Sequence, residues 1–163
     1  MTTLEHASPW SKLVYPTRTT LAAVLALGAA KLVGLPEFYW APVTALVVVQ
    51  PDFASTLTVS WQRLAGTALG AFAGSALAAN LGRGVMAYAL GIFGVGVLSA
   101  LLRLDRPANR FAAIALSIVL LIKRPDSAWI IGLHRFLEVA TGILAGMLLS
   151  AVWPEPDQET AKS

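Results

Sequence analysis

Long apolar blocks separated by short polar breaks dominate this chain. Six blocks can be placed, at Val14–Leu35, Tyr39–Gln50, Leu64–Leu81, Val85–Leu102, Phe111–Ile122 and Ile130–Trp153. A helix needs about 20 apolar residues to cross about 30 Å of hydrocarbon, and the second and fifth blocks have only about a dozen. The pattern therefore predicts an all-α integral membrane protein with six transmembrane helices, two of them short.

The two short blocks end alike, and similar residues follow each of them. The shared features are a proline-containing break, a tryptophan and a pair ending in arginine, then spaced glycines: Gln50-Pro51-Asp52, Trp61, Gln62-Arg63, Gly70 and Gly74 in the first half, and Arg124-Pro125-Asp126, Trp129, His134-Arg135, Gly142 and Gly146 in the second. Three crossings per unit would turn the second copy upside down, so we predict two inverted three-helix repeats. Coincidence among apolar helices is the alternative, because Pro-Asp pairs and glycines are common at helix ends.

Composition supports a membrane class and argues against several others. Hydrophobic residues make up 56% of the chain and charged residues only 13%, against about a quarter in soluble domains. The net charge is +3, but the Lys and Arg residues stand at block ends and form no basic face, so we expect no nucleic-acid partner. The chain has no cysteine, and His6 and His134 are its only histidines. We therefore expect no disulfide, metal site, cofactor or enzymatic activity.

We expect three segments along the chain: a tail at residues 1–12, the membrane domain at 13–153, and a disordered tail at 154–163. The stretch LAAVLALGAA after Arg18 resembles the core of a cleaved signal peptide. Because Lys31 and a further apolar turn to Leu35 continue it toward full span length, a retained first helix is favoured over a cleaved signal.

Orientation follows weakly from the cationic block ends. With the N-terminus inside, the inner side collects Lys12, Arg18, Arg63, Arg103, Arg106, Arg110 and Lys162, and the outer side collects Lys31, Arg83, Lys123, Arg124 and Arg135. Cytoplasmic loops carry an excess of such residues, so both termini are expected inside. Tryptophans and tyrosines near the block ends fit headgroup depth.

The first half also carries a family motif. The matching residues are Tyr39-Trp40-Ala41-Pro42-Val43-Thr44, Val48-Val49-Gln50-Pro51, Thr56, Arg63, Gly66-Thr67 and Gly70, and near the end Arg135, Glu138, Gly142, Gly146 and Trp153-Pro154. In these residues the chain resembles the fusaric acid resistance family, also called aromatic acid exporters. Motif residues cover roughly Thr20–Gly74, whereas 75–107 matches only in hydropathy.

The resemblance implies a six-helix domain of the bacterial inner membrane that exports organic anions such as hydroxylated aromatic carboxylates. It also implies a plan related to the plant aluminium-activated malate channels. Fuller family members append a soluble domain or a second membrane copy, and this chain ends soon after Trp153. It could be a complete exporter, a half that must pair, or a diverged relative. We expect a homodimer, because one six-helix unit with two short segments encloses little space.

Two arginines are the leading candidates for substrate binding. Arg63 and Arg135 are expected to open the helices that follow the breaks, where unpaired backbone N–H groups would also favour a carboxylate. The alternative is that each arginine snorkels to the headgroups as an anchor. Gln50 and Thr44 add uncharged hydrogen-bonding groups suited to a substrate hydroxyl, or to backbone groups freed by Pro51.

Acidic residues are candidates for proton coupling. Glu138 lies in an apolar helix, where an acid is costly unless it is paired or hydrated. It is either a proton-coupling carboxylate or a partner of Arg135 or His134. Asp52 is a second proton-coupling candidate, although Asp52 and Asp126 could instead cap the helices that follow them.

The remaining features have simpler interpretations. Lys31 is expected to snorkel to the interface. Gly66, Gly70, Gly74, Gly142 and Gly146 recur every fourth residue, a spacing that lets helices pack closely. The leading function is a transporter or channel for organic anions. A non-transporting membrane scaffold is second, and an integral-membrane enzyme is a distant third. Arginines lining a cavity would favour transport, and arginines at headgroup depth would favour the scaffold.

Overall fold

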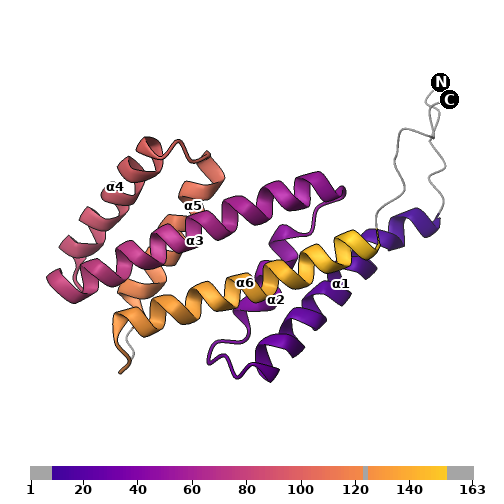
Figure 1. The fold of residues 1–163 in the computed structure, drawn as a ribbon, viewed down its shortest axis with the longest axis horizontal. Coiled ribbons are helices and arrows are strands. Elements are labelled where there is room, and N and C mark those ends of the chain that lie inside the picture. Colours follow the sequence, from indigo (N-terminus) through magenta and orange to yellow (C-terminus); the bar gives the residue numbers. More distant parts are fainter. Residues whose placement is uncertain (1–8, 123–124, 154–163) are drawn as a thin grey trace.

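The structure is a computed structural model that describes residues 9–122 and 125–153, and these are all-helical (Figure 1). The helices are α1 (Pro9–Leu32), α2 (Trp40–Val48), α3 (Phe53–Leu81), α4 (Val85–Leu101), α5 (Arg106–Leu121) and α6 (Ala128–Val152). The predicted all-α class is confirmed. Residues 1–8 and 154–163 of the expected tails lie outside the described residues, while residues 9–12 already belong to α1.

Three helices of the described chain are long and apolar enough to cross a bilayer: α1 over Leu13–Leu32, α3 and α6. The apolar helix α4 has 17 residues. The helix α2 has nine residues, and at 1.5 Å per residue it is only about 14 Å long. Pro51 follows closely and disfavours helical geometry in the residue before it, so the second block ends as a short helix.

The long helices begin earlier than the hydrophobic pattern predicts. The predicted start of the third block at Leu64 is wrong, because α3 begins at Phe53 and runs through Trp61 without a break. Its N-cap is Asp52, whose carboxylate accepts from the Ser55 amide at 2.8 Å. The N-cap of α6 is Ser127, whose hydroxyl accepts from the Ile130 amide at 3.4 Å. The prediction that Asp126 caps this helix is therefore wrong.

The two longest helices form the centre of the molecule. In Figure 1, α3 and α6 lie side by side and run in opposite directions. The short helix α2 packs on α6, and α5 packs on α3. On the outside, α1 contacts α2 and α6, while α4 contacts α5 and α3. Each of these helix–helix contacts thus has a counterpart when α1, α2 and α3 are exchanged with α4, α5 and α6.

Glycines lie where the short helices cross the long ones. A Cβ added at Gly70 would come within 2.8 Å of the Ala112 Cα in α5, and one at Gly74 within 3.1 Å of the Val119 Cβ. An added Cβ at Gly66 would meet α5 as well. On the other side, a Cβ at Gly142 would lie 2.6 Å from the Thr44 Cβ of α2, and one at Gly146 would lie 2.7 Å from the Val48 Cγ2. All five glycines therefore stand at close helix contacts.

Alanines form the contact between α1 and its neighbours. The fully buried residues Ala22, Ala26 and Ala30 follow one face of α1 at a four-residue spacing. They pack with Ala41 and Ala45 of α2, and with Ala145 of α6. We call this contact the alanine seam.

Burial is inverted relative to a water-soluble domain. Leu32, Val85 and Phe93 expose 90%, 86% and 72% of their surfaces. The interior buries ionisable side chains instead, among them Arg18 and Glu138. Lipid rather than water suits such an apolar exterior, so the helices form a membrane bundle.

Candidate functional site

Two arginines from the central helices meet inside the bundle. Arg63 lies about three turns into α3, and Arg135 lies about two turns into α6. Both are buried, at 7% and 2% exposure. The expectation that they open their helices is therefore wrong, because the caps at Asp52 and Ser127 place the free N–H groups further away. Neither guanidinium reaches the surface in the manner of a snorkelling anchor.

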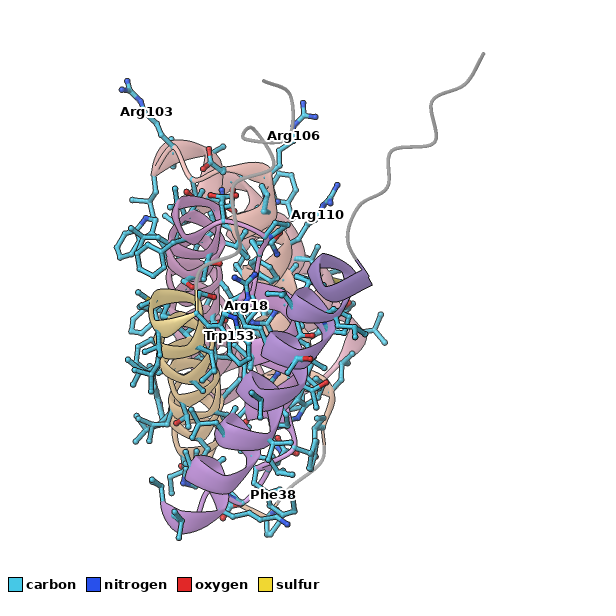
Figure 2. The ribbon with its side chains drawn as sticks, turned by 90° about the vertical axis from the view of Figure 1, so that its right-hand side faces the viewer. Arg18, Phe38, Arg103, Arg106, Arg110 and Trp153 are labelled. Atoms are coloured by element: carbon cyan, nitrogen blue, oxygen red, sulfur yellow. The ribbon has the colours of Figure 1, made fainter. Side chains whose placement is uncertain are left out.

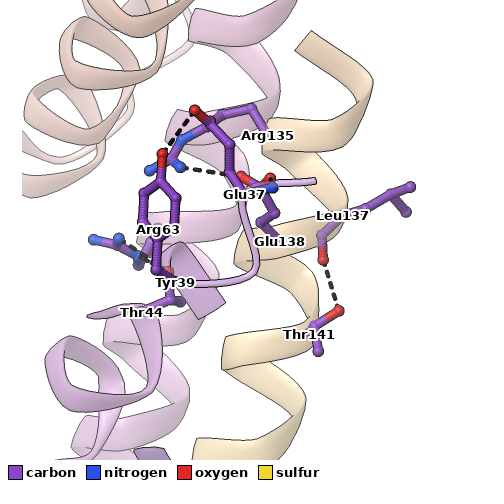
Figure 3. A network of polar contacts seen from close by, with 8 residues as sticks. All are labelled: Glu37, Tyr39, Thr44, Arg63, Arg135, Leu137, Glu138 and Thr141. Carbon is purple, nitrogen blue, oxygen red and sulfur yellow. Dashed lines mark hydrogen bonds and ion pairs between the residues drawn. The ribbon is translucent and has the colours of Figure 1, made fainter. Parts of the chain in front are cut away.

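Arg63 is held by a hydroxyl and an aromatic ring. Its Nε and Nη2 atoms donate to the Thr44 Oγ1 at 3.3 and 3.1 Å (Figure 3). The guanidinium carbon lies 4.9 Å from the centre of the Phe111 ring in α5, within cation–π range. No carboxylate of the described residues forms an ion pair with Arg63. Its charge is therefore stabilised by a hydroxyl dipole and a ring face, without an acid in contact.

Arg135 has an acid partner in its own helix. Its Nη1 atom pairs with the Glu138 Oε2 at 3.1 Å, the contact that the ion-pair alternative expects. The guanidinium also lies 3.8 Å from the centre of the Trp40 ring in α2. His134 makes no such contact, and its Nδ1 has no hydrogen-bond partner in the part of the chain that the structure describes.

Glu37 was not singled out from the sequence, yet it completes this group. It precedes α2, and its backbone amide donates to the Glu138 Oε1 at 3.2 Å. Its own Oε1 accepts from the Tyr39 hydroxyl at 2.9 Å. Glu37 is only 5% exposed. The available signal was an acid placed between Pro36 and the aromatic run Phe38-Tyr39-Trp40, a costly position beside an apolar helix.

We call Glu37, Tyr39, Thr44, Arg63, Arg135 and Glu138 the central polar cluster (Figure 3). Its residues come from α2, α3, α6 and the α1–α2 connection. A small cavity of about 10 Å³ lies beside Arg63 and Arg135, with Thr67 and Phe111 in its wall. That volume holds about one water molecule, so the conformation seen here is closed to a larger ligand.

Gln50 and Asp52 lie outside the central polar cluster. Both follow the far end of α2, where the buried Arg18 of α1 joins three backbone carbonyls. Arg18 donates from Nη2 to Gln50 O at 2.5 Å and to Pro51 O at 3.3 Å, and from Nη1 to Trp153 O at 3.2 Å. Arg18 thus ties α1 to the ends of α2 and α6, although its sequence position indicates only a topology signal. Figure 2 shows it beside Trp153.

The side chains of Gln50 and Asp52 serve local structure. The Gln50 Nε2 donates to Val47 O at 3.0 Å, and its backbone amide donates to the Thr56 Oγ1 at 3.0 Å. Asp52 caps α3, and hydrogen bonds from Ser55 lower the pKa of its carboxyl. The two residues therefore lie apart from Arg63 and Arg135, while Thr44 and Glu138 lie with them.

Three further observations concern the surroundings of the central polar cluster. An open, apolar hollow of about 330 Å³ lies between α3 and α6, with Ala68, Phe72, Trp129, Leu133 and Phe136 among its lining residues. Lys31 lies 4.9 Å from the centre of the Phe38 ring. Among the described residues, no group of three or more His, Cys, Asp or Glu side chains could hold a metal ion.

Comparison with known proteins gives a consistent result. The family described as fusaric acid resistance protein-like matches residues 23–149. The uncharacterized transporter YdhK of Escherichia coli (strain K12) is 30% identical over 171 residues, which cover 94% of this chain and 25% of that protein. The YdhK protein of Salmonella typhimurium (strain LT2) is 29% identical over 172 residues, with the same coverage. The chain thus spans about a quarter of the length of these relatives. No solved structure matches it.

Proposed function

Because the chain belongs to the fusaric acid resistance protein-like family, we propose that it is a membrane transport unit that moves organic anions, with aromatic carboxylates as the leading class. We further propose that it works in efflux across the bacterial inner membrane. The names of the relatives, which call them transporters, support a role in transport.

The observation that carries the proposal is the environment of Arg63. A buried guanidinium that contacts neither an acid nor backbone carbonyls among the described residues is costly in a membrane helix, and such residues typically mark a substrate or ion pathway. Its planar fork matches the geometry of a carboxylate, and the Phe111 ring beside it suits an aromatic substrate. We assign substrate binding to Arg63, Arg135 and Thr44.

Substrate binding requires a more open conformation. The cavity beside the arginines holds about one water molecule, far below the 300 Å³ or more of a typical small-molecule site. Movement of α2 or α5, which each contribute an aromatic ring to one arginine, would open the space. We propose that such movement alternates between the two membrane faces.

The proposed architecture is six membrane-crossing helices in two inverted repeats. The counterpart contacts of the two halves and the opposite directions of α3 and α6 support it. Each arginine also stacks on a ring from the other half, Arg63 on Phe111 and Arg135 on Trp40. A kinship with the plant malate channels stays an expectation.

The test is anion flux in proteoliposomes made with the full chain, with labelled benzoate as the probe. We expect Arg63→Gln to lower the flux by about tenfold or more, since a lost charged contact of about 1.4 kcal/mol corresponds to tenfold. Arg63→Lys should recover part of it, because the charge survives while the planar fork is lost. Arg103→Gln, which removes an exposed arginine, is the matched control and should retain parental flux.

An Arg63→Gln variant as fast as the parent would assign the arginine a structural role and move the site elsewhere. Equal losses in Arg63→Gln and Arg103→Gln would point to a general charge effect.

We also propose that two copies associate through the apolar hollow between α3 and α6. Large apolar residues line it, and Phe72 and Trp129 already contact one another at 5.6 Å between ring centres. Small residues such as Ala68 permit close approach of a second chain. A cysteine introduced at Phe72 should form a cross-linked dimer in membranes, whereas one at Phe93 on α4 should not.

A further inference from the structure

The charges of the central polar cluster balance before any ligand arrives. Arg63 and Arg135 supply two positive charges, and Glu37 and Glu138 supply two negative ones. All four residues are at least nine-tenths buried. When all of them are ionised the cluster is neutral, so an anion entering it would leave an uncompensated negative charge inside the bundle. Such a charge is strongly disfavoured in a low-dielectric interior.

The two carboxyl groups are placed so that they influence one another. The Glu138 carboxylate accepts from the backbone amide of Glu37, and the negative charge of Glu37 acts on Glu138. Repulsion between two carboxylates buried in one cluster favours protonation of one of them. The Tyr39 hydroxyl donates to Glu37, and Arg135 holds Glu138.

Other titratable groups near the central polar cluster do not alter its charge balance. Arg135 is the described cation that acts on Glu138, and Arg63 acts on Arg135 from α3. Tyr39, from the α1–α2 connection, acts on Arg135. Among the described residues, His134 of α6 forms no ion pair with Glu138, and Lys31 of α1 is exposed beside Phe38. The helices α2 and α5 present Thr44, Trp40 and Phe111 to the arginines and no charge.

We propose that Glu37 and Glu138 form a proton site that takes up one proton whenever an anion binds at Arg63 and Arg135, so that proton and anion cross the membrane together, outward when the outward gradient of the anion exceeds the inward gradient of the proton. The inference rests on the proposed function and adds the coupling of anion transport to proton transport. The proton comes from the aqueous side on which the anion enters. Once Glu138 is neutral it releases Arg135, the anion takes its place, and the cluster stays neutral. On the far side the anion and the proton both leave.

Calorimetry of benzoate binding to the purified full chain provides the test. Titration in two buffers of different ionisation enthalpy counts the protons taken up. We expect about one proton per benzoate near neutral pH, with affinity rising about tenfold for each unit that the pH falls, as one-proton linkage requires. In Glu37→Gln the cluster carries one positive charge without a bound proton. This variant should bind benzoate with no proton uptake and an affinity that no longer depends on pH.

Glu138→Gln should behave in the same way. If this variant does not fold because Arg135 has lost its partner, the result for Glu37→Gln alone tests the proposal. Asp105→Asn is the matched control, because it removes an exposed carboxylate whose described contact is Gln62 at 3.0 Å. It should keep the parental proton count. Parental binding without proton uptake, or full uptake retained in Glu37→Gln, would overturn the proposal.

A second readout separates this inference from the proposed function. Infrared spectroscopy without benzoate should show one carboxyl group of the pair taking up a proton as the pH falls, at a higher pH than an exposed glutamate of pKa about 4.3, because two buried carboxylates disfavour each other's charge. The signal should be lost in Glu37→Gln and kept in Asp105→Asn. If the signal appears but benzoate never binds, the proposed substrate fails and the proton site stands. If it is absent, the proton site fails whether or not benzoate binds.

Discussion

At the level of single residues, Arg18 and Arg63 show two ways in which this bundle buries a cation. The guanidinium of Arg18 is surrounded by backbone carbonyls from the ends of α2 and α6, where the helix dipole also favours positive charge. Arg63 contacts a hydroxyl and a ring instead. The Nη1 and Nη2 atoms of Arg18 are bonded to carbonyls at the helix ends, whereas Arg63 lies at the centre of the bundle beside a small cavity. These contacts fit a structural role for Arg18 and the proposed binding role for Arg63.

Replacing Arg18 should destabilise the fold. Arg18→Met keeps the length of the side chain but removes the donors to three carbonyls, and we expect a loss of about 2–4 kcal/mol in the free energy of unfolding. Arg18→Lys should recover part of it. Unfolding in detergent measures the effect, and the benzoate affinity of the folded fraction should stay at the parental value. An Arg18→Met variant as stable as the parent would contradict the structural role.

Part of the central polar cluster was predictable from single residues and part was not. Arg63, Arg135, Thr44 and Glu138 stand out as polar groups in apolar blocks, and the structure brings these four together. Their convergence depends on how α3 crosses α6, which no local pattern contains. Glu37 was not predicted because it lies between two apolar blocks, where a connection exposed to water would accommodate an acid, and its burial at 5% exposure becomes visible only in the structure.

At the level of helices, the glycine contacts determine how closely α2 and α5 approach the long helices. Because the added Cβ at Gly70 meets backbone atoms, the neighbouring helix would have to shift. Gly94 of α4 is the opposite case, since an added Cβ there has no neighbour within 4 Å. The two positions form a matched pair within the same bundle.

We expect Gly70→Ala to destabilise the protein by about 1–3 kcal/mol through overpacking. Gly94→Ala should be neutral or stabilising by up to about 1 kcal/mol, because alanine is the better helix former. Unfolding in detergent, measured for both variants, checks the pair. Equal effects at the two positions would show that close packing at Gly70 contributes nothing to stability.

Helix existence was easier to predict than helix limits. The apolar blocks correctly indicated where helices occur, and Pro51 explains the short α2. The early start of α3 was missed because Thr56, Thr58 and Ser60 make its first turns look amphipathic. In the structure the Thr56 hydroxyl donates to Asp52 O at 3.1 Å and the Thr58 hydroxyl donates to Ala54 O at 3.0 Å. These bonds within the helix satisfy both hydroxyls without interrupting it. Hydropathy alone does not register such bonds.

At the level of the whole molecule, three arginines around the α4–α5 connection lie together at one end. Figure 2 shows Arg103, Arg106 and Arg110 at one end and Phe38 at the opposite end. An excess of arginine marks the cytoplasmic side of a membrane protein, so the α4–α5 connection is expected inside and the α1–α2 connection outside.

Cysteine labelling tests this orientation cleanly, because the natural chain has no cysteine. Leu102 and Val33 are matched sites, both apolar and exposed by 57% and 69%, at the two opposite connections. In intact cells an impermeant maleimide should label Val33→Cys, and Leu102→Cys should react only after permeabilisation. The reverse pattern would invert the proposed topology, and labelling of both sites in intact cells would contradict a single orientation.

The alanine seam has a mechanical consequence. A methyl group has no side-chain torsions to rearrange, so a helix whose contact surface is built from methyl groups can be displaced along its neighbour without any rotamer change. We therefore expect that α1 can shift along α2 and α6 at the seam, and that the hydrogen bonds from Arg18 to the carbonyls at one end of the seam limit this shift.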